Sequence, residues 1–402
     1  MHTYEDALAT IQKALSESAH NPPFENLLLE HAGGRVLAED IAADRDYPPF
    51  HRSTRDGFAV RSGDVRHLPT TLTLLGLVRA GTHYTGKVGP GECVEIMTGA
   101  PLPSGADAVV MLEYAKVDAR RVEVQRPVAS HENVVPQGSE APAGSIVLRK
   151  GRRLGAGEVG LLASVGRARV QAFLPPQVAI LPTGDEVVPV DETPEWFQIR
   201  NSNAFSLAAQ VEAAGGVPRR LPVAPDEKSA LRKLIEEGFE SDLLLLSGGV
   251  SMGKYDFVKQ VLDELGAEFY VQAVAIRPGK PLLFGRAQGK FFFGLPGNPV
   301  STYVTFELFA RPAIALLGGA ESEPPMFLRA RLAEPFRQRL DLTLFTPARV
   351  GIESGDPVVV PVGWQGSGDL VGVAAANCFL VIHPEQTDLA AGDWVDVLPK
   401  PA

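Results

Sequence analysis

The sequence predicts a multidomain α/β and β protein, in which a three-layer α/β domain is accompanied by smaller β-rich modules. The chain has 402 residues, more than one hydrophobic core usually serves. Between Pro176 and Gly319, compact apolar strands alternate with helical segments, which is the pattern of a parallel α/β sheet. The 40 Gly and 33 Pro residues are scattered without a period, and this distribution indicates many turns and short strands elsewhere.

Composition argues against several classes of protein. The net charge of −10, with no block of Lys and Arg, disfavours a nucleic-acid partner. Only Cys93 and Cys378 occur, without a CxxC pair, so we expect no disulfide framework or structural zinc site and a reducing compartment. Glu5 and Asp6 stand where a signal peptide would be basic, and no run approaches the roughly 20 apolar residues of a membrane span. We expect a cytoplasmic protein with no membrane partner.

The first 170 residues predict a helix, a connector and a β-rich domain. Apolar residues from Tyr4 to Leu15 recur at helical spacing, and Thr3 with Asp6 forms a capping-box start. From about Asn21 to Ile41 we expect another helix and a turn. Short apolar runs between residues 47 and 140, such as 71–78 and 108–112, predict a small β-rich domain. The glycine-rich stretch 142–170 is expected to return the chain to the connector.

The elements of the α/β domain can be assigned in order. Apolar runs predict the strands, and capped periodic segments predict the helices between them. The expected elements are a strand at Val178–Leu181, a helix at Asn203–Ala214, a strand at Val217–Val223, a helix capped by Asp226 and ending at Glu237, a strand at Leu243–Leu246, a helix at Tyr255–Leu265, strands at Phe269–Ala275, Leu282–Phe284 and Phe291–Phe293, and a helix from Pro299. After Pro324 and Pro325, short strands with turns at Gly351, Gly355, Gly368 and Gly392 predict a carboxy-terminal β module.

Two loops of this domain are candidate binding loops, because ligands of open α/β sheets bind beyond the carboxyl ends of the strands. The first loop is PTGDEVV, with Thr183, Gly184, Asp185 and Glu186. A plain glycine turn with an Asp cap is the alternative. The second is SGGVSMGKYD, and its residues Gly248, Gly249 and Ser251 precede a helix that Gly253 opens and that carries Asp256. Adjacent glycines let backbone amides approach a phosphate, which favours an anion site over a bland turn, although GxxxxGK[ST] is absent.

A third loop combines cations with a helix start. In IRPGKPLLFG, Arg277 and Lys280 flank a Pro–Gly turn, and in GLPGNPVS the stiff turn of Pro296, Gly297, Asn298 and Pro299 begins a helix. This arrangement suits an oxyanion. The alternative is a surface turn with a solvated Lys.

Two further segments carry polar residues that could complete a site. Asp56 stands in FHRSTRDGFAV and Thr98 in EIMTGAPLPSG; each alone is more simply a turn with an Asx or Thr cap. Together with Glu186 and Asp256 they could form a set of polar side chains that needs a divalent cation, for which Mg²⁺ is suited. The eight His residues are dispersed without HExxH, and no GxSxG or catalytic Cys context appears.

Six motifs in order carry a resemblance to a known family. DGFAV, IMTGAPLPSGADAVVMLE, PTGDEVV, SGGVSMGKYD, RPGKP and GLPGNPVS resemble the molybdopterin molybdenumtransferases, whose relatives include the gephyrin E domain. The match spans roughly residues 4 to 400. The resemblance implies molybdenum insertion: molybdate and adenylylated molybdopterin are the substrates, and Mg²⁺ assists the hydrolysis that releases AMP.

The resemblance also implies a domain division and an elongated homodimer with active sites shared between subunits. The domains would be an N-terminal helix packing on the α/β domain (1–19), a connector (20–45 and 141–172), a small β-rich domain (46–140), a molybdopterin-binding α/β domain like that of MogA (173–320) and a C-terminal β-barrel domain (325–402). Pterin and oxyanion would be its small-molecule partners. A pterin adenylyltransferase and apo-molybdoenzymes are the protein partners that this role suggests.

Matched residue by residue, the resemblance assigns roles within the site. Catalytic residues would be Asp56 and Thr98 from the partner subunit, with Glu186 and Asp256. Glu186, Asp226 and Asp256 would hold Mg²⁺. The pterin substrate would contact Gly184, Asp185, Gly248, Gly249, Ser251, Pro296, Gly297, Asn298 and Pro299, and molybdate would contact Arg277, Lys280, Pro281, Ser301, Arg349 and Ser367.

Three positions depart from the family's pattern, and two other functions are alternatives. Arg55 stands where Met is common, Glu140 where an Asp is common, and Asn201 where Asp is frequent. An Arg beside Asp56 would lower the pKa of that carboxyl. A scaffold protein is one alternative, which the acidic residues disfavour. A pterin adenylyltransferase is the other, and it lacks the flanking β modules.

Overall fold

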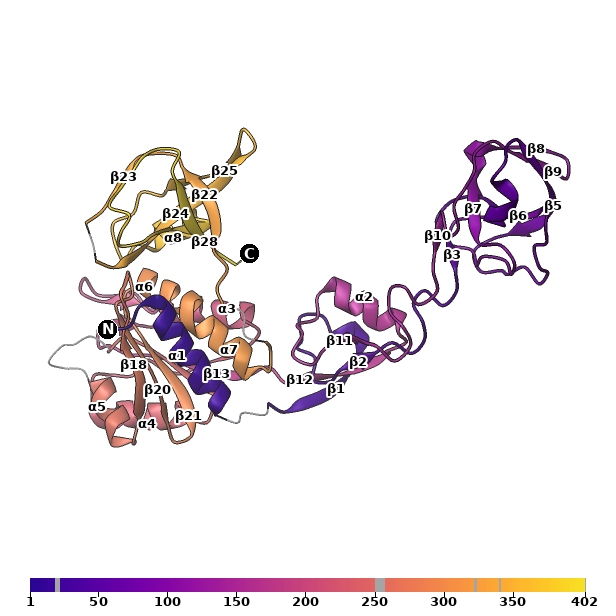
Figure 1. Cartoon of the computed structure of the whole chain (residues 1–402). Coiled ribbons are helices and arrows are strands. Elements are labelled where there is room, and N and C mark those ends of the chain that lie inside the picture. The colour runs from indigo at the N-terminus through magenta and orange to yellow at the C-terminus, as the bar shows by residue number, and fades with distance from the viewer. Residues whose placement is uncertain (19–21, 250–256, 322–323, 340, 402) are drawn as a thin grey trace.

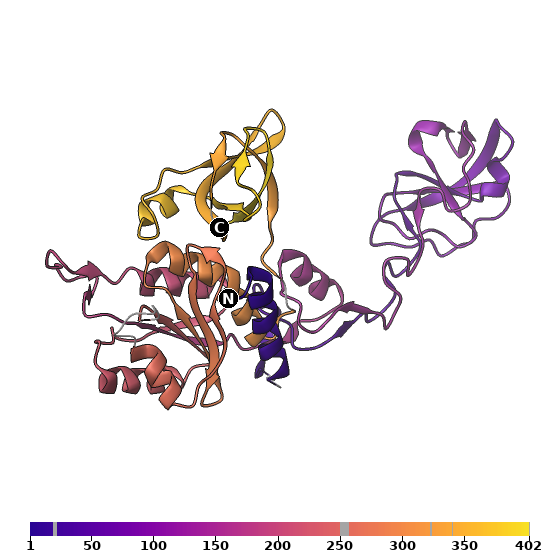
Figure 2. The same ribbon diagram turned by 60° about the vertical axis from the view of Figure 1, so that its left-hand side comes forward.

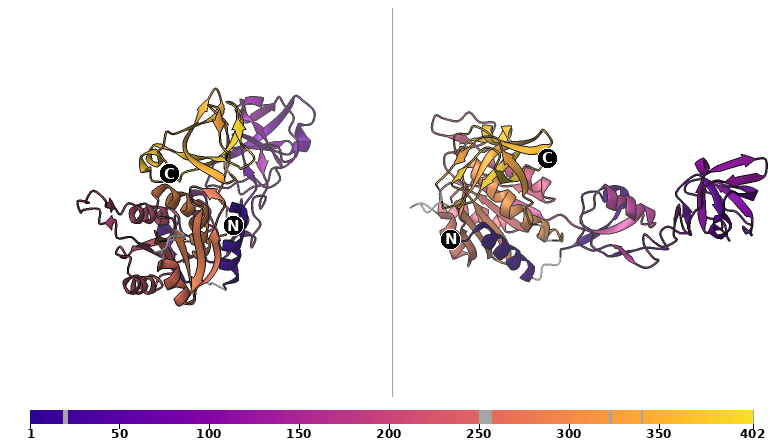
Figure 3. Two further views of the ribbon diagram at one scale, coloured as in Figure 1. Left: turned by 90° about the vertical axis from the view of Figure 1, so that its left-hand side faces the viewer. Right: turned by 45° about the horizontal axis from the view of Figure 1, so that its top comes forward.

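The molecule is elongated, and its elements form four groups along its length (Figure 1). The computed structural model describes residues 1–18, 22–249, 257–321, 324–339 and 341–401. The α/β domain and the carboxy-terminal barrel lie together at one end, a small connector lies in the middle, and a small β domain lies at the other end. Figure 2 and the right-hand view of Figure 3 show the same separation from other directions. The small β domain is therefore remote from the α/β domain of its own chain.

The α/β domain is built on a six-stranded sheet in the order β16-β13-β17-β21-β20-β18. Its strands are β13 (Gln177–Pro182), β16 (Val217–Arg220), β17 (Leu243–Ser247), β18 (Glu268–Ala273), β20 (Pro281–Ala287) and β21 (Lys290–Leu295). The sheet is mixed and not wholly parallel as expected, because β20 runs antiparallel to both of its neighbours. The cause is a tight connection: Gln288 and Gly289 both have positive φ, which closes a hairpin where a parallel pair would need a crossover.

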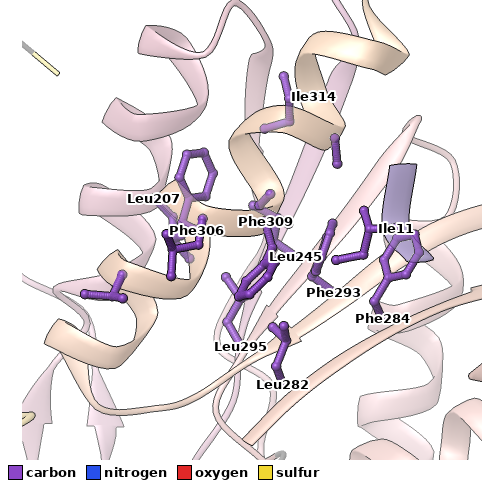
Figure 4. Close-up of a cluster of buried hydrophobic side chains, with 14 of the residues drawn as sticks. Ile11, Leu207, Leu245, Leu282, Phe284, Phe293, Leu295, Phe306, Phe309 and Ile314 are labelled. Atoms are coloured by element: carbon purple, nitrogen blue, oxygen red, sulfur yellow. The ribbon is translucent and has the colours of Figure 1, made fainter. Parts of the chain in front are cut away.

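Helices cover both faces of the sheet, which confirms the three layers. One face packs against α1 (Tyr4–Glu17), α3 (Asn203–Ala213), α6 (Pro299–Thr305) and α7 (Arg311–Leu317). The other face packs against α4 (Lys228–Gly238) and α5 (Phe257–Glu264). Figure 4 shows the first core, where Ile11, Leu207, Leu245, Phe293 and Phe309 meet.

The amino-terminal helix follows its sequence pattern. The Thr3 hydroxyl accepts a hydrogen bond of 3.1 Å from the Asp6 backbone N–H, and Ala7, Leu8, Ile11 and Leu15 are buried. Burial of this apolar stripe fixes α1 on the α/β domain.

In the same core, the helical run Pro299–Leu317 is long and apolar enough to cross a membrane, but 78% of it is buried in the fold, as in a core helix.

The connector is held by two pairs of strands. β1 (Phe24–Leu28) pairs with β12 (Arg169–Phe173), and β2 (Ile41–Ala42) pairs with β11 (Ile146–Leu148). The helix expected between Asn21 and Ile41 was wrong, because β1 gives its hydrogen bonds to a strand distant in sequence and only the single turn Leu29–His31 is helical. The return segment contributes α2 (Ala156–Ser164).

The small β domain is a six-stranded sheet in the order β7-β4-β6-β5-β9-β8. Its strands are β4 (Gly57–Val60), β5 (Thr70–Val78), β6 (Glu92–Ile96), β7 (Ala108–Met111), β8 (Ala115–Asp118) and β9 (Arg121–Val124). Two cores lie on its two faces, one around Phe58 and the other around Val94. The chain enters and leaves through β3 (Arg52–Ser53) and β10 (Val134–Val135), which pair with each other.

The carboxy-terminal module is a closed five-stranded barrel, as expected. Its strands follow the ring β24-β25-β22-β28-β26, and pairing of β26 with β24 closes it. They are β22 (Leu328–Leu332), β24 (Thr343–Glu353), β25 (Asp356–Pro361), β26 (Cys378–Ile382) and β28 (Trp394–Pro399), with the side pair β23 (Phe336–Arg337) and β27 (Asp388–Leu389) and the helix α8 (Leu370–Ala375). Gly351 is not a turn residue, because it pairs with Val358 inside the long strand β24. β19 (Ile276–Arg277) of the α/β domain pairs with β24 and joins the two domains.

Candidate functional site

A cavity of about 460 Å³ lies at the carboxyl ends of β13, β17 and β21. The loop after β13 contributes Thr183, Gly184 and Glu186, and the loop after β17 contributes Gly248 and Gly249. The turn after β21 contributes Pro296, Gly297, Asn298 and Pro299. The fold thus brings all three predicted loops to one place, as expected for the ends of adjacent parallel strands. Ser251 lies outside the described residues.

The two glycines after β17 allow close backbone approach. Gly248 has a φ of +99° and Gly249 a φ of +65°, values that side-chain-bearing residues rarely adopt. A Cβ on Gly248 would lie 2.8 Å from the Thr183 carbonyl oxygen, and a Cβ on Gly249 would lie 2.7 Å from Cγ2 of Val258. Only glycine suits either position, so main-chain atoms line the cavity here. We call this part of the cavity wall, formed by Gly248 and Gly249, the glycine floor.

Asn203 ties the loops together, and sequence reasoning missed this role. Its side-chain amide donates to the Gly297 carbonyl oxygen at 2.7 Å, to the Ser247 hydroxyl at 2.9 Å and to the Thr302 hydroxyl at 3.4 Å. The sequence pattern predicts only that Asn203 begins a helix. The missed signal is that an Asn at the first helical position has no capping role and must place its side chain elsewhere.

One side of the cavity is acidic. Glu186 and Asp226 line it, and the Asp226 backbone N–H donates to a carboxylate oxygen of Asp185 at 2.9 Å. Burial, followed by the negative charges of Asp185 and Glu186, raises the pKa of the Asp226 carboxyl. Asp226 does not cap α4 as predicted; Glu227 holds the N-cap position, and Asp226 belongs to the preceding loop.

Only two of the three carboxylates predicted to hold a metal ion belong to the described residues. Asp256 lies outside the described residues. Among the residues that are described, no group of three His, Cys, Asp or Glu side chains is arranged to hold a metal ion. Glu186 and Asp226 are thus the two predicted ligands whose positions beside the cavity are known.

The basic residues lie at the opposite edge. Pro281 and the buried Ser301 line the cavity, while Arg277 and Lys280 are exposed just before Pro281 in the chain. In the described part of the molecule, neither cation forms an ion pair. The pairing of Arg277 with Leu344 places this edge beside the barrel.

The barrel reaches the cavity through Ser367 but not through Arg349. The Ser367 hydroxyl accepts a hydrogen bond of 2.9 Å from the side-chain amide of Asn298, and its carbonyl oxygen accepts one of 2.9 Å from Val300 N–H. The barrel therefore caps the first turn of α6, where Asn298 makes no side-chain cap of its own. Arg349 instead donates to the Ala375 carbonyl oxygen at 2.8 Å, at the end of α8, and does not line the cavity.

Asp56 and Thr98 form a pair in the remote small β domain. One carboxylate oxygen of Asp56 accepts from the Thr98 N–H at 2.6 Å and from the Thr98 hydroxyl at 2.8 Å. These two bonds, and not the adjacent Arg55, lower the pKa of Asp56. Glu140 lies closer to the connector, where it forms an exposed ion pair with Arg52. Within one chain, the small β domain that carries this pair lies at the opposite end of the molecule from the α/β domain (Figure 1).

Three family models match successive parts of the chain. Residues 2–166 match "MoeA N-terminal region (domain I and II)", residues 179–316 match "Probable molybdopterin binding domain", and residues 329–400 match "MoeA C-terminal region (domain IV)". The flanking matches separate this chain from enzymes that consist of the α/β domain alone.

Known proteins match along nearly the whole chain. A molybdopterin molybdenumtransferase from Staphylococcus aureus is 34% identical over 393 residues, which are 96% of this chain and 94% of that protein. A protein of the same name from Staphylococcus epidermidis is 33% identical over 93% of this chain and 90% of its own length. The crystal structure of the molybdopterin biosynthesis moeA protein from Pyrococcus horikoshii OT3 covers 100% of both chains with a TM-score of 0.80 and 29% identity. This chain therefore belongs to the molybdopterin molybdenumtransferases, enzymes of molybdenum cofactor biosynthesis.

Proposed function

We propose that this enzyme acts in the cytoplasm, where it transfers molybdenum from molybdate onto adenylylated molybdopterin and releases AMP in a Mg²⁺-dependent hydrolysis. The observation that carries the proposal is the cavity itself. It has an acidic side with Glu186 and Asp226, a glycine floor, and an edge at Pro281 that leads to the exposed cations Arg277 and Lys280. A substrate with a phosphoanhydride and a separate oxyanion needs each of these features.

The glycine floor suits the phosphates of the pterin substrate. Gly248 and Gly249 line the cavity with main-chain atoms and carry no side chain of their own. The rigid turn from Pro296 to Pro299 faces the two glycines. A Cβ built on Gly297 would lie only 3.5 Å from the Cα of Gly248. A phosphate held between the two loops would meet backbone amides and a helix start.

The acidic side suits a magnesium ion. Burial, followed by the negative charges of Asp185 and Glu186, raises the pKa of Asp226, so a cation there would relieve the repulsion. Mg²⁺ commonly keeps several waters and takes only one or two carboxylates together with substrate phosphates. Glu186 and Asp226, with Asp256, would hold it. When bound, Mg²⁺ supplies charge neutralisation at the phosphoanhydride.

The basic edge suits molybdate. Arg277 and Lys280 are free to bind a dianion, since no carboxylate in the described part of the chain neutralises them. The Ser301 hydroxyl can donate to an oxyanion, and Ser367 holds Asn298 in place beside it. Arg349 is engaged with α8, so its proposed contact with molybdate would require it to leave Ala375.

The functional unit is proposed to be a homodimer in which Asp56 and Thr98 come from the second copy. The small β domain lies at the far end of its own chain, so a second chain is the simplest source of these residues (Figure 3). With its pKa lowered by Thr98, Asp56 remains ionised and orients the attacking water as a hydrogen-bond acceptor. Water then cleaves the phosphoanhydride: the adenylate phosphorus gains the hydroxyl, and the pterin phosphate leaves with its oxygen and the proton.

The proposed activity can be measured directly. Adenylylated molybdopterin, molybdate and Mg²⁺ should give AMP and a pterin that reconstitutes an apo-molybdoenzyme. Asp56→Ala should abolish AMP release but keep molybdate affinity, whereas Lys280→Ala should weaken molybdate binding. Absence of metal-dependent AMP release would rule out the proposed reaction.

Mixing the two variants, at a molybdate concentration too low for the Lys280→Ala site to turn over, tests the shared site. In a mixed dimer, the cavity of the Asp56→Ala chain meets the intact Asp56 of the Lys280→Ala chain. Half of randomly paired dimers are mixed, and each has one intact site, so about a quarter of the wild-type rate should return. A mixture as inactive as its components would show that the sites are not shared. Supply of adenylylated pterin by an adenylyltransferase, and delivery to apo-molybdoenzymes, are the partner reactions that this activity requires.

A further inference from the structure

A projecting arm beside the cavity exposes two aromatic rings. The arm comprises residues 189–198, between β14 (Val187–Val188) and β15 (Ile199–Arg200), and it extends from the α/β domain at the left of Figure 2. Trp196 is 94% exposed and Phe197 is 52% exposed, although their rings pack edge to face at 5.6 Å. Val187 and Ile199, at the base of the arm, line the cavity. Grouped exposed aromatics of this kind mark interaction surfaces.

The arm is also acidic. Asp191, Glu192 and Glu195 are exposed, and none of their carboxylates forms an ion pair with a described residue. Arg200, at the base of the arm, donates to the Glu192 main-chain carbonyl at 3.1 Å and not to a carboxylate of the arm. The arm therefore presents unneutralised negative charge around Trp196, and a partner surface should be basic with an apolar element.

The surface around Asp56 has those properties. Arg55 is exposed directly before Asp56, and Arg79 is exposed beside Thr98, because Met97 N–H donates to the Val78 carbonyl at 3.0 Å. Leu112, which is 41% exposed, donates its N–H to the Asp56 carbonyl oxygen at 3.2 Å. We call this surface, formed by Arg55, Arg79, Thr98 and Leu112 around Asp56, the Asp56 face. Its two guanidinium groups also have no ion-pair partner among the described residues.

We infer that the arm of one copy docks on the Asp56 face of a second copy and positions that Asp56 over the cavity. The inference rests on the proposed shared site and identifies the surface that assembles it. A second copy that brings Asp56 to the cavity must approach the cavity mouth, and the arm stands at that mouth. Acidic side chains then meet Arg55 and Arg79, while Trp196 covers Leu112 or stacks on a guanidinium.

Mixed dimers make the inference testable, because only one of their two sites works. That site uses the cavity and arm of the Asp56→Ala chain and the Asp56 face of the Lys280→Ala chain. Trp196→Ala with Glu195→Lys is therefore placed in the Asp56→Ala chain in one mixture and in the Lys280→Ala chain in another. We expect the first mixture to lose AMP release about tenfold relative to the second. Equal loss in both mixtures would overturn the inference.

A charge exchange tests the pairing itself. Glu195→Arg alone and Arg55→Glu alone should each weaken dimerisation of the full chain about fivefold, as measured by analytical ultracentrifugation over a range of concentrations. The two changes together should restore at least half of the lost affinity. Additive weakening would overturn the inference, as would a dimer that is indifferent to both changes, for example because the arm serves another protein.

The matched control is the exposed Trp394 of the barrel. It is 41% exposed, lies away from the arm on β28, and is stacked by Arg331. Trp394→Ala removes the same side chain from a surface that the inference does not use, so its effect on the dimer dissociation constant should stay well below that of Trp196→Ala. Failure of the proposed function remains distinguishable, because it would abolish complementation before any arm residue is changed.

Discussion

The side-chain amide of Asn203 donates a 2.7 Å hydrogen bond to the carbonyl oxygen of Gly297, which ties the start of α3 to the turn after β21. Asn203→Asp replaces that donor with an acceptor that faces a carbonyl oxygen. We expect the free energy of unfolding to fall by about 1–3 kcal/mol and the KM for the pterin substrate to rise, because the two loops separate. Urea unfolding and steady-state AMP release measure the two effects.

Asn201→Asp is the matched control for that substitution. Toward the described residues, the Asn201 side chain uses its oxygen, as an acceptor from Ala204 N–H at 3.2 Å, and Asp retains this bond. Stability should therefore fall less than in Asn203→Asp. Equal destabilisation would mean that added charge, and not the lost donor, is what matters near α3.

The Thr98 hydroxyl sets part of the acidity of Asp56. Thr98→Val removes the 2.8 Å side-chain bond but keeps the 2.6 Å bond from the backbone N–H, so the pKa of Asp56 should rise part of the way to its ordinary value. A carboxylate with a lowered pKa stays charged to lower pH, so the acidic limb of the pH–rate profile should move upward in this variant. Thr98→Ser, which keeps the hydroxyl, should leave the limb near its original position; a shift of equal size would remove the hydroxyl as the cause.

Two glycines of the cavity should respond differently to alanine. In Gly248→Ala the new Cβ meets the Thr183 carbonyl oxygen at 2.8 Å on a backbone with φ of +99°, and a loss of about 1–3 kcal/mol of stability is expected. In Gly297→Ala the nearest atom is at 3.5 Å, an ordinary contact, so stability should change little. Thermal unfolding of the two variants decides the matter, and equal melting temperatures would contradict the assigned backbone strain.

Both cysteines should be unreactive in the folded protein. Burial raises the pKa of the Cys93 thiol to about 12 and that of Cys378 to about 11. At pH 8, alkylation should be about a hundredfold slower than in denaturant, where both thiols react. Because the folded state holds these protons more tightly than the unfolded state, the thiols' contribution to stability is lost as pH rises from the ordinary thiol range toward these values. Rapid labelling of one native thiol would indicate local opening.

Local patterns predicted most of the α/β domain, and the error in the connector arose from a pairing distant in sequence. The apolar run Leu243–Leu246 and the capped start at Thr3 each specify their element through neighbouring residues. In contrast, Phe24–Leu28 is a strand only because Arg169–Phe173 arrives to pair with it. A non-local pairing of this kind leaves no periodic signal in the segment itself.

The candidate site shows the same limit. Chain topology placed Gly184, Gly248 and Gly297 together, since all follow neighbouring strands. Asn203 was missed because its three acceptors come from β17, the turn after β21 and α6, and Arg349 was placed at the anion site although it donates to the end of α8. Side-chain direction, unlike loop position, depends on partners that sequence spacing does not reveal.

The small β domain is nested inside the connector, and both ends of the insertion lie side by side. Tyr47 N–H donates to the Ala141 carbonyl at 2.8 Å, so the chain leaves the connector and returns to it through neighbouring residues. The outer domain can therefore be excised or exchanged as a cassette with a short splice between these positions. Synthesis from the amino terminus also imposes an order. β1 is made early but cannot pair until β12 has been made, so the whole small β domain is synthesised before the connector can form its β1–β12 pair.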